Sequence, residues 1–466
     1  QYLNSLISEL GSCKVTAPLL LMQSNGGLTS AQRSIKLPCN IIESGPAGGV
    51  VGAHALATKL ELGDVVTFDM GGTTAKASLI ERGEYSRAVD FSVGAGIMSG
   101  SRLLTGAGYR LKVPAIDLAE VGAGGGSIIS VDAGGAMVVG PKSAGANPGP
   151  ACYGLGGKLP TVTDANVILG YLNPKYLVGG AVKIKVELSR QAIMDAVAIP
   201  MELAIERAAY GAHQIAASNM IRAIKAVSSE RGRDPRRYSL FAFGGNGPLF
   251  AATMAHALGM QQIVIPPAPG LFSSFGLLYA DVEHHYSRTH RRILRKADPH
   301  ELQEAWLELE NQAREQLKGD GFPEERISLS RLANMHYHGQ IFELTTSAPD
   351  GPIDAKALSA LEESFGQEHE RTYGHRAGPE EPVELVNIEL VAQGIPERER
   401  VPEKLNSESR TSPGEHARKA YFGPADGWQE SRIIDRTSIT EGIDGPVIIE
   451  EYDATCLIPP RATAIL

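Results

Sequence analysis

The sequence predicts an α/β domain with a long insertion, followed by an α+β module and a strand-rich C-terminal segment. Three observations lead to this prediction. Strands that end in glycine turns alternate with helices up to about residue 290. The apolar spacing then changes to that of one long helix followed by alternating strands, and short strand-forming runs dominate from residue 420 onward.

Length and charge narrow the class of protein. The chain has 466 residues, enough for several domains at ~100–200 residues each. Its 44 basic and 53 acidic residues give a net charge of -9, which argues against a nucleic-acid partner. No run approaches the ~18 consecutive apolar residues of a membrane helix, and no secretory leader is recognisable, so we expect a cytoplasmic protein with no membrane contact. The 4 cysteines are widely spaced, which suggests neither a zinc ribbon nor a disulfide framework.

The first residues of the chain have the spacing of an amphipathic helix. Apolar side chains recur at helical spacing from Tyr2 to Leu10, and no Ser, Thr, Asp or Asn precedes them as a cap. We therefore expect that residues upstream are missing from this chain.

An apolar strand from Pro18 to Met22 leads into Ser-Asn-Gly-Gly at residues 24–27, and Glu43 to Leu60 then predicts a helix. Small side chains on this helix would let another helix approach closely. They are Gly48, Gly49, Gly52 and Ala53. The alternative is a packing helix that its glycines weaken.

A β-hairpin with an unusual tip comes next. Val65 to Phe68 predicts a buried strand that Asp69 ends, Gly71 and Gly72 make a tight turn, and Ala75 to Ile80 returns. The tip also carries the hydroxyls of Thr73 and Thr74. Glycines let backbone N–H groups point at phosphate oxygens, hydroxyls add donors, and an Asp at a strand end can hold the water shell of Mg²⁺. An ordinary Gly-Gly hairpin does not require this tip, so we predict a phosphate site.

A second strand with a glycine turn follows the same logic. Ser239 to Phe243 predicts a strand, and Pro248 begins a helix, with Gly244, Gly245, Asn246 and Gly247 between them. A helix N-terminus that faces such a turn suits the polar edge or the phosphate of a nucleotide. A helix from Ile205 to Glu230 precedes the strand. Together these features predict half of a two-lobed nucleotide clamp.

The remaining pattern divides the chain further. Helices are predicted at Asp298–Lys318 and Asp354–Tyr373, with strands at Leu332–Thr346 and Val383–Val391. The predicted divisions are residues 1–290 for the nucleotide-binding lobe, with its insertion at about 86–200, then 291–395 for the α+β module, 396–419 for a linker or exposed loop and 420–466 for the strand-rich segment.

Other candidate residues favour structural roles. Asp281, Glu283, His284 and His285 resemble a metal cluster, but neighbours on a strand point to opposite faces and cannot all converge. His336 and His338 would share one strand face, which a solvated strand also gives. No GxSxG, HExxH or GxxxxGK[ST] motif occurs, so the sequence supports neither a serine hydrolase, a zincin nor a P-loop protein.

At these residues the sequence resembles the actin-like ATPase superfamily, whose fold is ribonuclease H-like. There a helix of small residues precedes an Asp-x-Gly-Gly-Thr hairpin, the second phosphate loop, and a strand ends in Gly-Gly as the adenosine motif. Over nearly the whole chain it is similar to the hydantoinase A, 5-oxoprolinase and acetone or acetophenone carboxylase family. The segments that carry this similarity include LLLMQSNGGLTS, ESGPAGGVVGA, FDMGGTTAKASLI, KVPAIDLAEVGAGGGSI, GPKSAGANPGPACYG, PTVTDANVILGYL, FGGNGPLFA, MHYHGQIFEL, RTYGHR and GPVIIEEYDAT.

The resemblance implies ATP and Mg²⁺ as cofactors. It makes Asp69, Thr73 and Thr74 the catalytic contacts to the β- and γ-phosphates, with Asp69 holding Mg²⁺ through water. It makes Gly71 and Gly72 further phosphate contacts, and it makes Gly244, Gly245, Asn246 and Gly247 adenosine contacts. Asp117 and Glu120 lie in a family signature, where either a substrate contact or a turn role is open. Family members also open with a lobe that carries a first phosphate loop, which we expect in the same or another chain.

The implied activity is ATP-dependent ring opening of a cyclic amide of the hydantoin or 5-oxoproline type. The chain would phosphorylate the carbonyl group, and a hydantoinase B-type subunit would complete the reaction. The first alternative is a subunit of an ATP-dependent acetone or acetophenone carboxylase, with a ketone as substrate. The second is a nucleotide-gated interaction protein whose lobes close on ATP.

Overall fold

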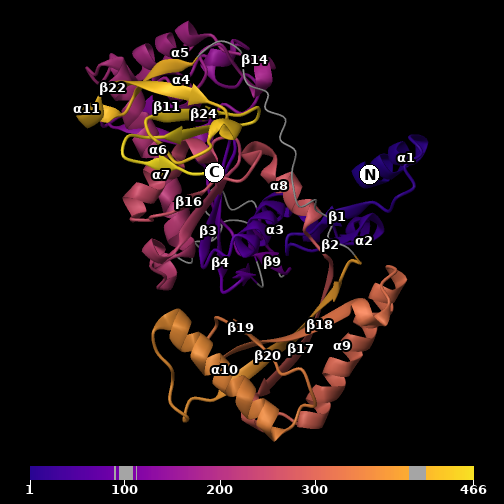
Figure 1. The fold of residues 1–466 in the computed structure, drawn as a ribbon. Helices are drawn as coiled ribbons and strands as arrows, with labels where there is room; N and C mark the ends of the chain where they lie inside the picture. Colours follow the sequence, from indigo (N-terminus) through magenta and orange to yellow (C-terminus); the bar gives the residue numbers. More distant parts are fainter. Residues whose placement is uncertain (89–90, 94–108, 112, 398–415) are drawn as a thin grey trace.

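The computed structural model describes residues 1–88, 91–93, 109–111, 113–397 and 416–466. Most of the predicted linker, residues 398–415, and residues 94–108 of the predicted insertion lie outside these ranges. The described residues form a large lobe, which contains the hairpin and the second glycine turn, and a smaller module of one sheet with two long helices (Figure 1).

The lobe is built on a 6-stranded sheet in the order β10-β4-β3-β15-β16, with β5 paired to β4. Its strands are β3 (Val65–Met70), β4 (Ala75–Glu81), β5 (Glu84–Tyr85), β10 (Ala119–Val121), β15 (Ser239–Phe243) and β16 (Ile263–Val264). The predicted hairpin is confirmed as β3 and β4, in which Asp69 lies opposite Lys76. β15 runs parallel to β3 and places Phe243 beside Asp69. The carboxyl ends of two parallel strands therefore meet at one edge of the sheet.

Helices cover both faces of this sheet. Phe68 and Met70 pack in the core that contains α6 (Ile205–Val227) and α7 (Gly247–Leu258). Val65 packs in the core on the other face, which contains α3 (Ser44–Lys59) and, through Phe272, α8 (Phe272–Phe275). Because side chains alternate along a strand, Asp69 points to the α3 side with Val65. The helices predicted from Glu43, Ile205 and Pro248 are confirmed as α3, α6 and α7.

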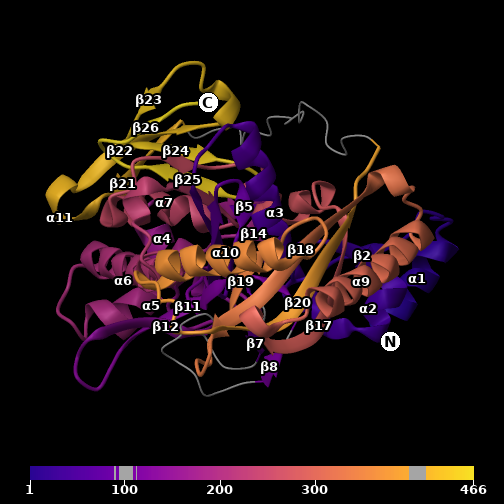
Figure 2. The same cartoon turned by 90° about the horizontal axis from the view of Figure 1, so that it is seen from below.

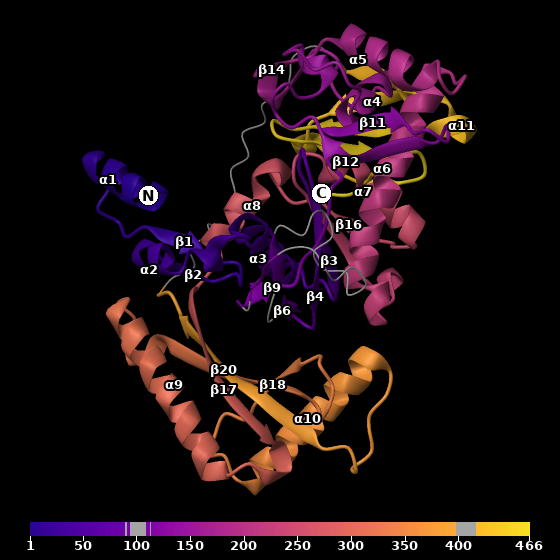
Figure 3. The same ribbon diagram turned by 180° about the vertical axis from the view of Figure 1, so that it is seen from behind.

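The far end of the lobe combines the insertion with the C-terminal segment, as Figures 1 and 3 show. The insertion supplies β11 (Ser127–Val131), β12 (Met137–Ser143), α4 (Val162–Ile168) and α5 (Val186–Ile193). The C-terminal segment forms a 4-stranded sheet of β21 (Ala417–Tyr421), β22 (Trp428–Ile434), β24 (Val447–Glu450) and β25 (Thr455–Ile458). Its residues Tyr421, Ile448 and Leu457 are buried in the same core as α6 and α7. The strand-rich segment is thus part of the lobe rather than an appendage.

The module consists of a 6-stranded sheet in the order β1-β2-β17-β20-β18-β19. Its strands are β1 (Leu20–Met22), β2 (Leu28–Ser30), β17 (Val282–Ile293), β18 (Ile327–Tyr337), β19 (Leu344–Ser347) and β20 (Val383–Gly394). Two long helices, α9 (Pro299–Gly319) and α10 (Ala355–Tyr373), pack on one face (Figure 2). The predicted limit at residue 290 falls inside β17. We assigned β1 and β2 to residues 1–290, but they belong to the sheet of the module, because β2 pairs with β17.

The N-terminal stripe forms α1 (Tyr2–Ser12), which leads to α2 (Ala31–Lys36) through β1 and β2. In the ranges that the structure describes, no helix is long and apolar enough to cross a membrane.

Candidate active site

Three glycine-containing turns meet at the carboxyl ends of β3 and β15. They are the hairpin tip at residues 71–74, the turn at residues 244–247 and the run at residues 122–126. Gly125 N donates to Gly71 O at 3.2 Å, and Gly126 N donates to Gly72 O at 2.7 Å. The third turn is the part of the family signature to which we could assign no chemical role from the residues alone. It forms one wall of the hairpin tip.

Close contacts between the turns explain why residues 124 and 125 are glycine. A Cβ atom on Gly124 would lie 2.5 Å from the backbone nitrogen of Thr73, so any side chain there would push the two turns apart. A Cβ atom on Gly125 would lie 2.8 Å from Nδ2 of Asn246. Gly72 itself stays exposed, and nothing lies within 4 Å of its Cβ position. The 122–126 turn therefore packs against one side of the hairpin tip, and Gly72 leaves another side exposed.

The second turn is tied to the hairpin. Asn246 N donates to Met70 O at 3.0 Å, and the side-chain amide of Asn246 donates to Gly71 O at 3.2 Å. Gly244 has a φ of +79°, and a side chain there would collide with the carboxylate of Asp69. We predicted Asn246 as an adenosine contact, and in the structure its side chain contacts the β3–β4 hairpin. Gly245 beside it is exposed, whereas the first turn of α7 is buried.

Burial raises the pKa of Asp69 above its ordinary value. A hydrogen bond from Ser273 Oγ at 3.4 Å and the positive charge of Lys76 act in the opposite direction and only partly offset the burial. A cation bound next to this half-buried carboxylate would stabilise its charged form.

Lys76 completes this part of the site. Its Nζ lies 2.7 Å from Oε2 of Glu43, at the start of α3, and 3.7 Å from Oε1 of Glu120. Register pairs Glu120 with Lys76 and Lys76 with Asp69, so the three side chains share one face of the sheet. Our sequence prediction did not include Lys76. Alternation along the returning strand would have placed it on the face of Asp69.

The residues present fit a magnesium ion that accompanies a nucleotide. No group of three or more His, Cys, Asp or Glu residues within the described ranges could hold a metal ion. Mg²⁺ in nucleotide sites keeps several waters and takes one or two carboxylates plus phosphate oxygens, so a single carboxylate such as Asp69 meets its needs.

The remaining candidates have structural partners. Asp117 forms an ion pair with Arg231, and Glu120 faces Lys76. Along β17, Glu283 bonds to Arg87 and His285, whereas Nε2 of His284 lies 2.5 Å from Asp320. Glu283 and His285 thus lie on one face of the strand and His284 on the other. Nε2 of His336 lies 3.0 Å from Glu384, and His338 follows the last residue of β18.

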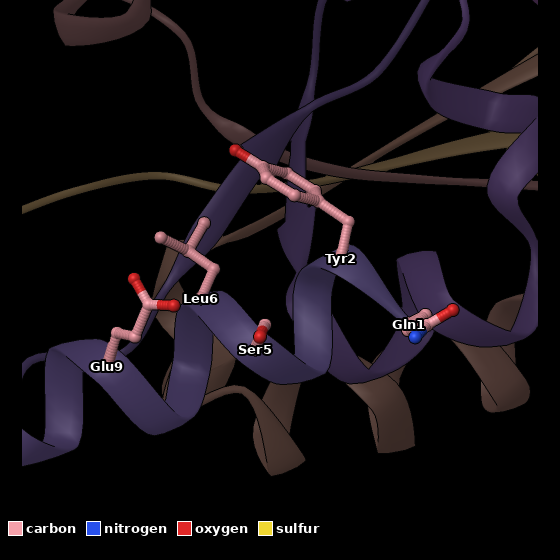
Figure 4. A pocket seen from close by; sticks show the side chains of 5 residues that line it. All are labelled: Gln1, Tyr2, Ser5, Leu6 and Glu9. Atoms are coloured by element: carbon pink, nitrogen blue, oxygen red, sulfur yellow. The ribbon is translucent and has the colours of Figure 1, made fainter.

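One pocket lies far from these turns in sequence. It is a hollow along α1, lined by Gln1, Tyr2, Ser5, Leu6 and Glu9 (Figure 4). A binding site usually gathers polar groups from several elements, and this hollow takes all its side chains from one helix and the residue before it. It therefore supports no catalytic role.

Comparisons with known proteins identify the family models and the relatives that this chain resembles. The family model described as hydantoinase/oxoprolinase matches residues 1–286, and the model of the hydantoinase/oxoprolinase C-terminal domain matches residues 290–466. An uncharacterized protein of Methanocaldococcus jannaschii is 37% identical over 100% of this chain and 66% of its own length. The alpha subunit of caprolactamase from Pseudomonas jessenii is 34% identical over 98% of this chain and 64% of its own length. The chain thus spans slightly less than two thirds of these relatives.

Solved structures give the same picture. The crystal structure of ATP-dependent caprolactamase from Pseudomonas jessenii matches with a TM-score of 0.82 at 33% identity, over 98% of this chain and 65% of that one. Nucleotide-free acetone carboxylase, from a study of ATP-dependent acetone carboxylation, matches with a TM-score of 0.74 at 27% identity, over 98% of this chain and 64% of that one.

Proposed function

Since the chain belongs to the hydantoinase/oxoprolinase family and its lobe has the actin-like ATPase fold, we propose that it uses ATP to activate the carbonyl group of a cyclic amide for ring opening. The observation that supports this most directly is the meeting of the 71–74, 122–126 and 244–247 turns beside a half-buried carboxylate.

Each predicted site residue has a role in this proposal. Asp69 holds Mg²⁺ through water, and Thr73 and Thr74 donate to the β- and γ-phosphates together with the backbone of Gly71 and Gly72. The turn of Gly244, Gly245, Asn246 and Gly247 borders the adenosine, and Asn246 also fixes the hairpin through Gly71. Mg²⁺ supplies charge neutralisation between the phosphates when it is bound.

The chemistry explains why ATP is needed. An amide is a poor electrophile until its oxygen carries a phosphoryl group. The carbonyl oxygen forms a bond to the γ-phosphorus, the bond to the bridging oxygen breaks and ADP leaves, while the amide N–H proton passes to a base. Water then adds to the activated carbon, the C–N bond breaks and the amine nitrogen takes up a proton, which leaves an acyl phosphate. A second water hydrolyses this acyl phosphate to the carboxylate and free phosphate. Positioning and charge stabilisation by the hairpin supply the catalysis of the first step.

We propose that a partner subunit of the hydantoinase B type completes the ring opening. The support is indirect: the similar caprolactamase and acetone carboxylase chains are named as subunits. A further lobe with the first phosphate loop, in the same or another chain, would cover the exposed side of the 71–74 turn and complete the two-lobed nucleotide site. We expect the enzyme to act in the cytoplasm, where ATP is available.

The test is ATP turnover by the full-length protein with its partner subunit. ADP release should rise when hydantoin, 5-oxoproline or a lactam is added. Asp69→Ala should lower this turnover by about 10²–10³-fold, the usual effect of losing one group that stabilises the transition state. Asp132→Ala is the matched control, because Asp132 caps the β11–β12 turn through Gly134 N at 2.8 Å, in a different hairpin. Unchanged turnover in Asp69→Ala would contradict the phosphate assignment.

One observation favours a second candidate, ATP-dependent ketone carboxylation: the similarity to acetone carboxylase extends over almost the whole chain. The same assay separates the two. Stimulation by acetone or acetophenone together with bicarbonate, with no response to any cyclic amide, would replace the first proposal by the second.

A further inference from the structure

Lys76 lies on the same face of the sheet as Asp69. It follows the hairpin tip by two residues and pairs across the strands with Asp69. Directly paired side chains on one sheet face have Cβ atoms about 5 Å apart, and a lysine carries its charge on a flexible stem of four carbons. Its ammonium group can therefore reach any group that Asp69 approaches through a water molecule.

The surroundings of Lys76 favour a role beyond stability. Its side chain is only 16% exposed, and the carboxylates of Glu43, Glu120 and Asp69 surround its single positive charge. The cluster therefore carries excess negative charge when all three carboxylates are ionised. An isolated structural ion pair would match one positive charge with one negative charge. A cluster with unbalanced negative charge suits the arrival of a cation with its phosphate groups.

Glu43 is placed to orient the lysine. It precedes the first residue of α3, its side chain makes no helix cap, and its backbone N–H donates to Ser24 Oγ at 3.1 Å. Its carboxylate binds Lys76 Nζ at 2.7 Å. A lysine held by a glutamate from a neighbouring helix is the arrangement by which protein kinases present a positive charge to the phosphates of ATP.

We propose that Lys76, oriented by Glu43, binds the γ-phosphoryl group of ATP and stabilises its charge during transfer. This inference rests on the proposed function and adds a residue to its site. Because only ATP carries the γ-phosphate, Lys76 distinguishes ATP from ADP, whereas Asp69 and the glycine turns serve both nucleotides.

The experiment compares ATP and ADP in the full-length protein, with Kd measured by calorimetry in Mg²⁺ and turnover measured with the partner subunit. Lys76→Met should weaken ATP binding at least about 10-fold, change ADP binding less than about 3-fold and lower kcat by about 10²-fold. Lys76→Arg should keep part of the ATP preference, since the charge remains but its geometry differs. Glu43→Gln should lower kcat while leaving the ATP preference in place, because the charge stays but loses its orientation.

Arg233→Met is the matched control. Arg233, from the segment before β15, forms a similarly buried pair with Glu81, which lies on the same strand as Lys76 but away from the hairpin tip. The two side chains are 14% and 16% exposed. It should lower thermal stability as Lys76→Met does and leave the ratio of ATP to ADP affinity unchanged.

Two outcomes would overturn the inference alone. One is an equal loss of ATP and ADP affinity in Lys76→Met, and the other is a change no larger than that in Arg233→Met. If the wild-type protein binds neither nucleotide, the proposed function itself fails, and the inference fails with it.

Discussion

At the scale of single residues, burial of the Asp69 carboxylate, which we propose to be catalytic, lowers the stability of the fold at neutral pH. Burial raises its pKa, so its charged form is disfavoured in the folded chain relative to the unfolded one. An acid whose folded pKa is raised contributes stability at low pH and loses it as the pH rises through the folded value. Every tenfold change in its acid dissociation constant on folding corresponds to ~1.4 kcal/mol.

We therefore expect Asp69→Asn to be more stable than the wild type at pH 7 and inactive. Its advantage should shrink as the pH falls toward the ordinary pKa of an aspartate, because the wild-type carboxyl is then neutral as well. Thermal unfolding without nucleotide, between pH 4 and pH 7.5, measures this. A variant less stable than the wild type at pH 7 would show that the carboxylate supports the fold.

His213 gives a second pH dependence, of the opposite sign. It is fully buried between α4 and α7: Nδ1 lies 2.8 Å from Oδ1 of Asn166, and the ring stacks on Phe250 with centroids 4.1 Å apart. Burial lowers its pKa from 6.5 to about 3. A base with a lowered folded pKa contributes stability above its unfolded value, and this stability is lost as the pH falls.

The free energy of unfolding should therefore fall between pH 6.5 and pH 4.5 with a contribution from His213 of up to ~1.4 kcal/mol per pH unit. His213→Phe keeps the stacking and removes the titration. It should be less stable at pH 7.5 by about 1–3 kcal/mol, because Asn166 loses its partner, but less sensitive to acid. Urea unfolding at pH 7.5, 6 and 5 tests this. Parallel pH profiles of variant and wild type would rule out His213 as the source.

At the scale of elements, the glycines of α3 set the distance between the helix and its neighbours. A Cβ atom on Gly49 would collide with the ring of Phe243, and one on Gly48 would lie 2.5 Å from Ser273 O. Both neighbours adjoin Asp69, through strand register and through the Ser273 hydrogen bond. The close approach of α3 therefore determines where the carboxylate of Asp69 lies.

Two alanine substitutions in α3 should act in opposite directions. Gly49→Ala should cost about 1–3 kcal/mol through overpacking and also lower turnover, because the displaced Phe243 borders Asp69. Gly45→Ala is the control: nothing lies within 4 Å of its Cβ position, so it should stabilise the helix by up to about 1 kcal/mol. Thermal unfolding and ATP turnover of both variants measure this. Equal effects of the two substitutions on stability would show that the spacing of α3 is not limiting.

The sequence predicts elements better than it predicts contacts between them. Hydrophobic spacing and turn residues predict α3, α6, the β3–β4 hairpin and the β15 turn, because each depends on a local pattern. The proximity of Gly125 to Gly71 depends on folding of the insertion, and no local pattern encodes it. No local pattern predicts that the side chain of Asn246 donates to Gly71 O of the hairpin either. The position of Lys76 could have been predicted from the sequence, because the alternation of side chains along the returning strand places it on the same face as Asp69.

At the scale of the whole molecule, the C-terminal segment stabilises the lobe in which the site lies. Arg418, with a side chain 7% exposed, binds Glu450 of its own segment and donates to Gly170 O at 2.7 Å and to Tyr171 O at 3.0 Å. Near the site, the backbone of Leu271 donates to Asp453 at 3.2 Å, and a side chain on Gly270 would lie 2.6 Å from Asp453 O. The segment therefore spans from the insertion to the neighbourhood of the 244–247 turn.

This arrangement predicts that a destabilising substitution in the C-terminal segment also affects the proposed nucleotide site. Arg418→Met should cost about 3–5 kcal/mol, because Glu450 is left as a buried charge and two backbone carbonyl groups lose a donor. Hydrogen exchange should increase in β21 and β24, and also in α4 and α7, which lie against the segment in the same core. Arg461→Met is the control, because Arg461 binds Asp426 with a side chain 77% exposed, so its loss should leave exchange unchanged. If exchange increases only within residues 416–466, the segment is an independent unit and the lobe folds without it. If α7 responds as well, the N-terminus of α7 at the nucleotide turn depends on a strand pair that lies much further along the chain.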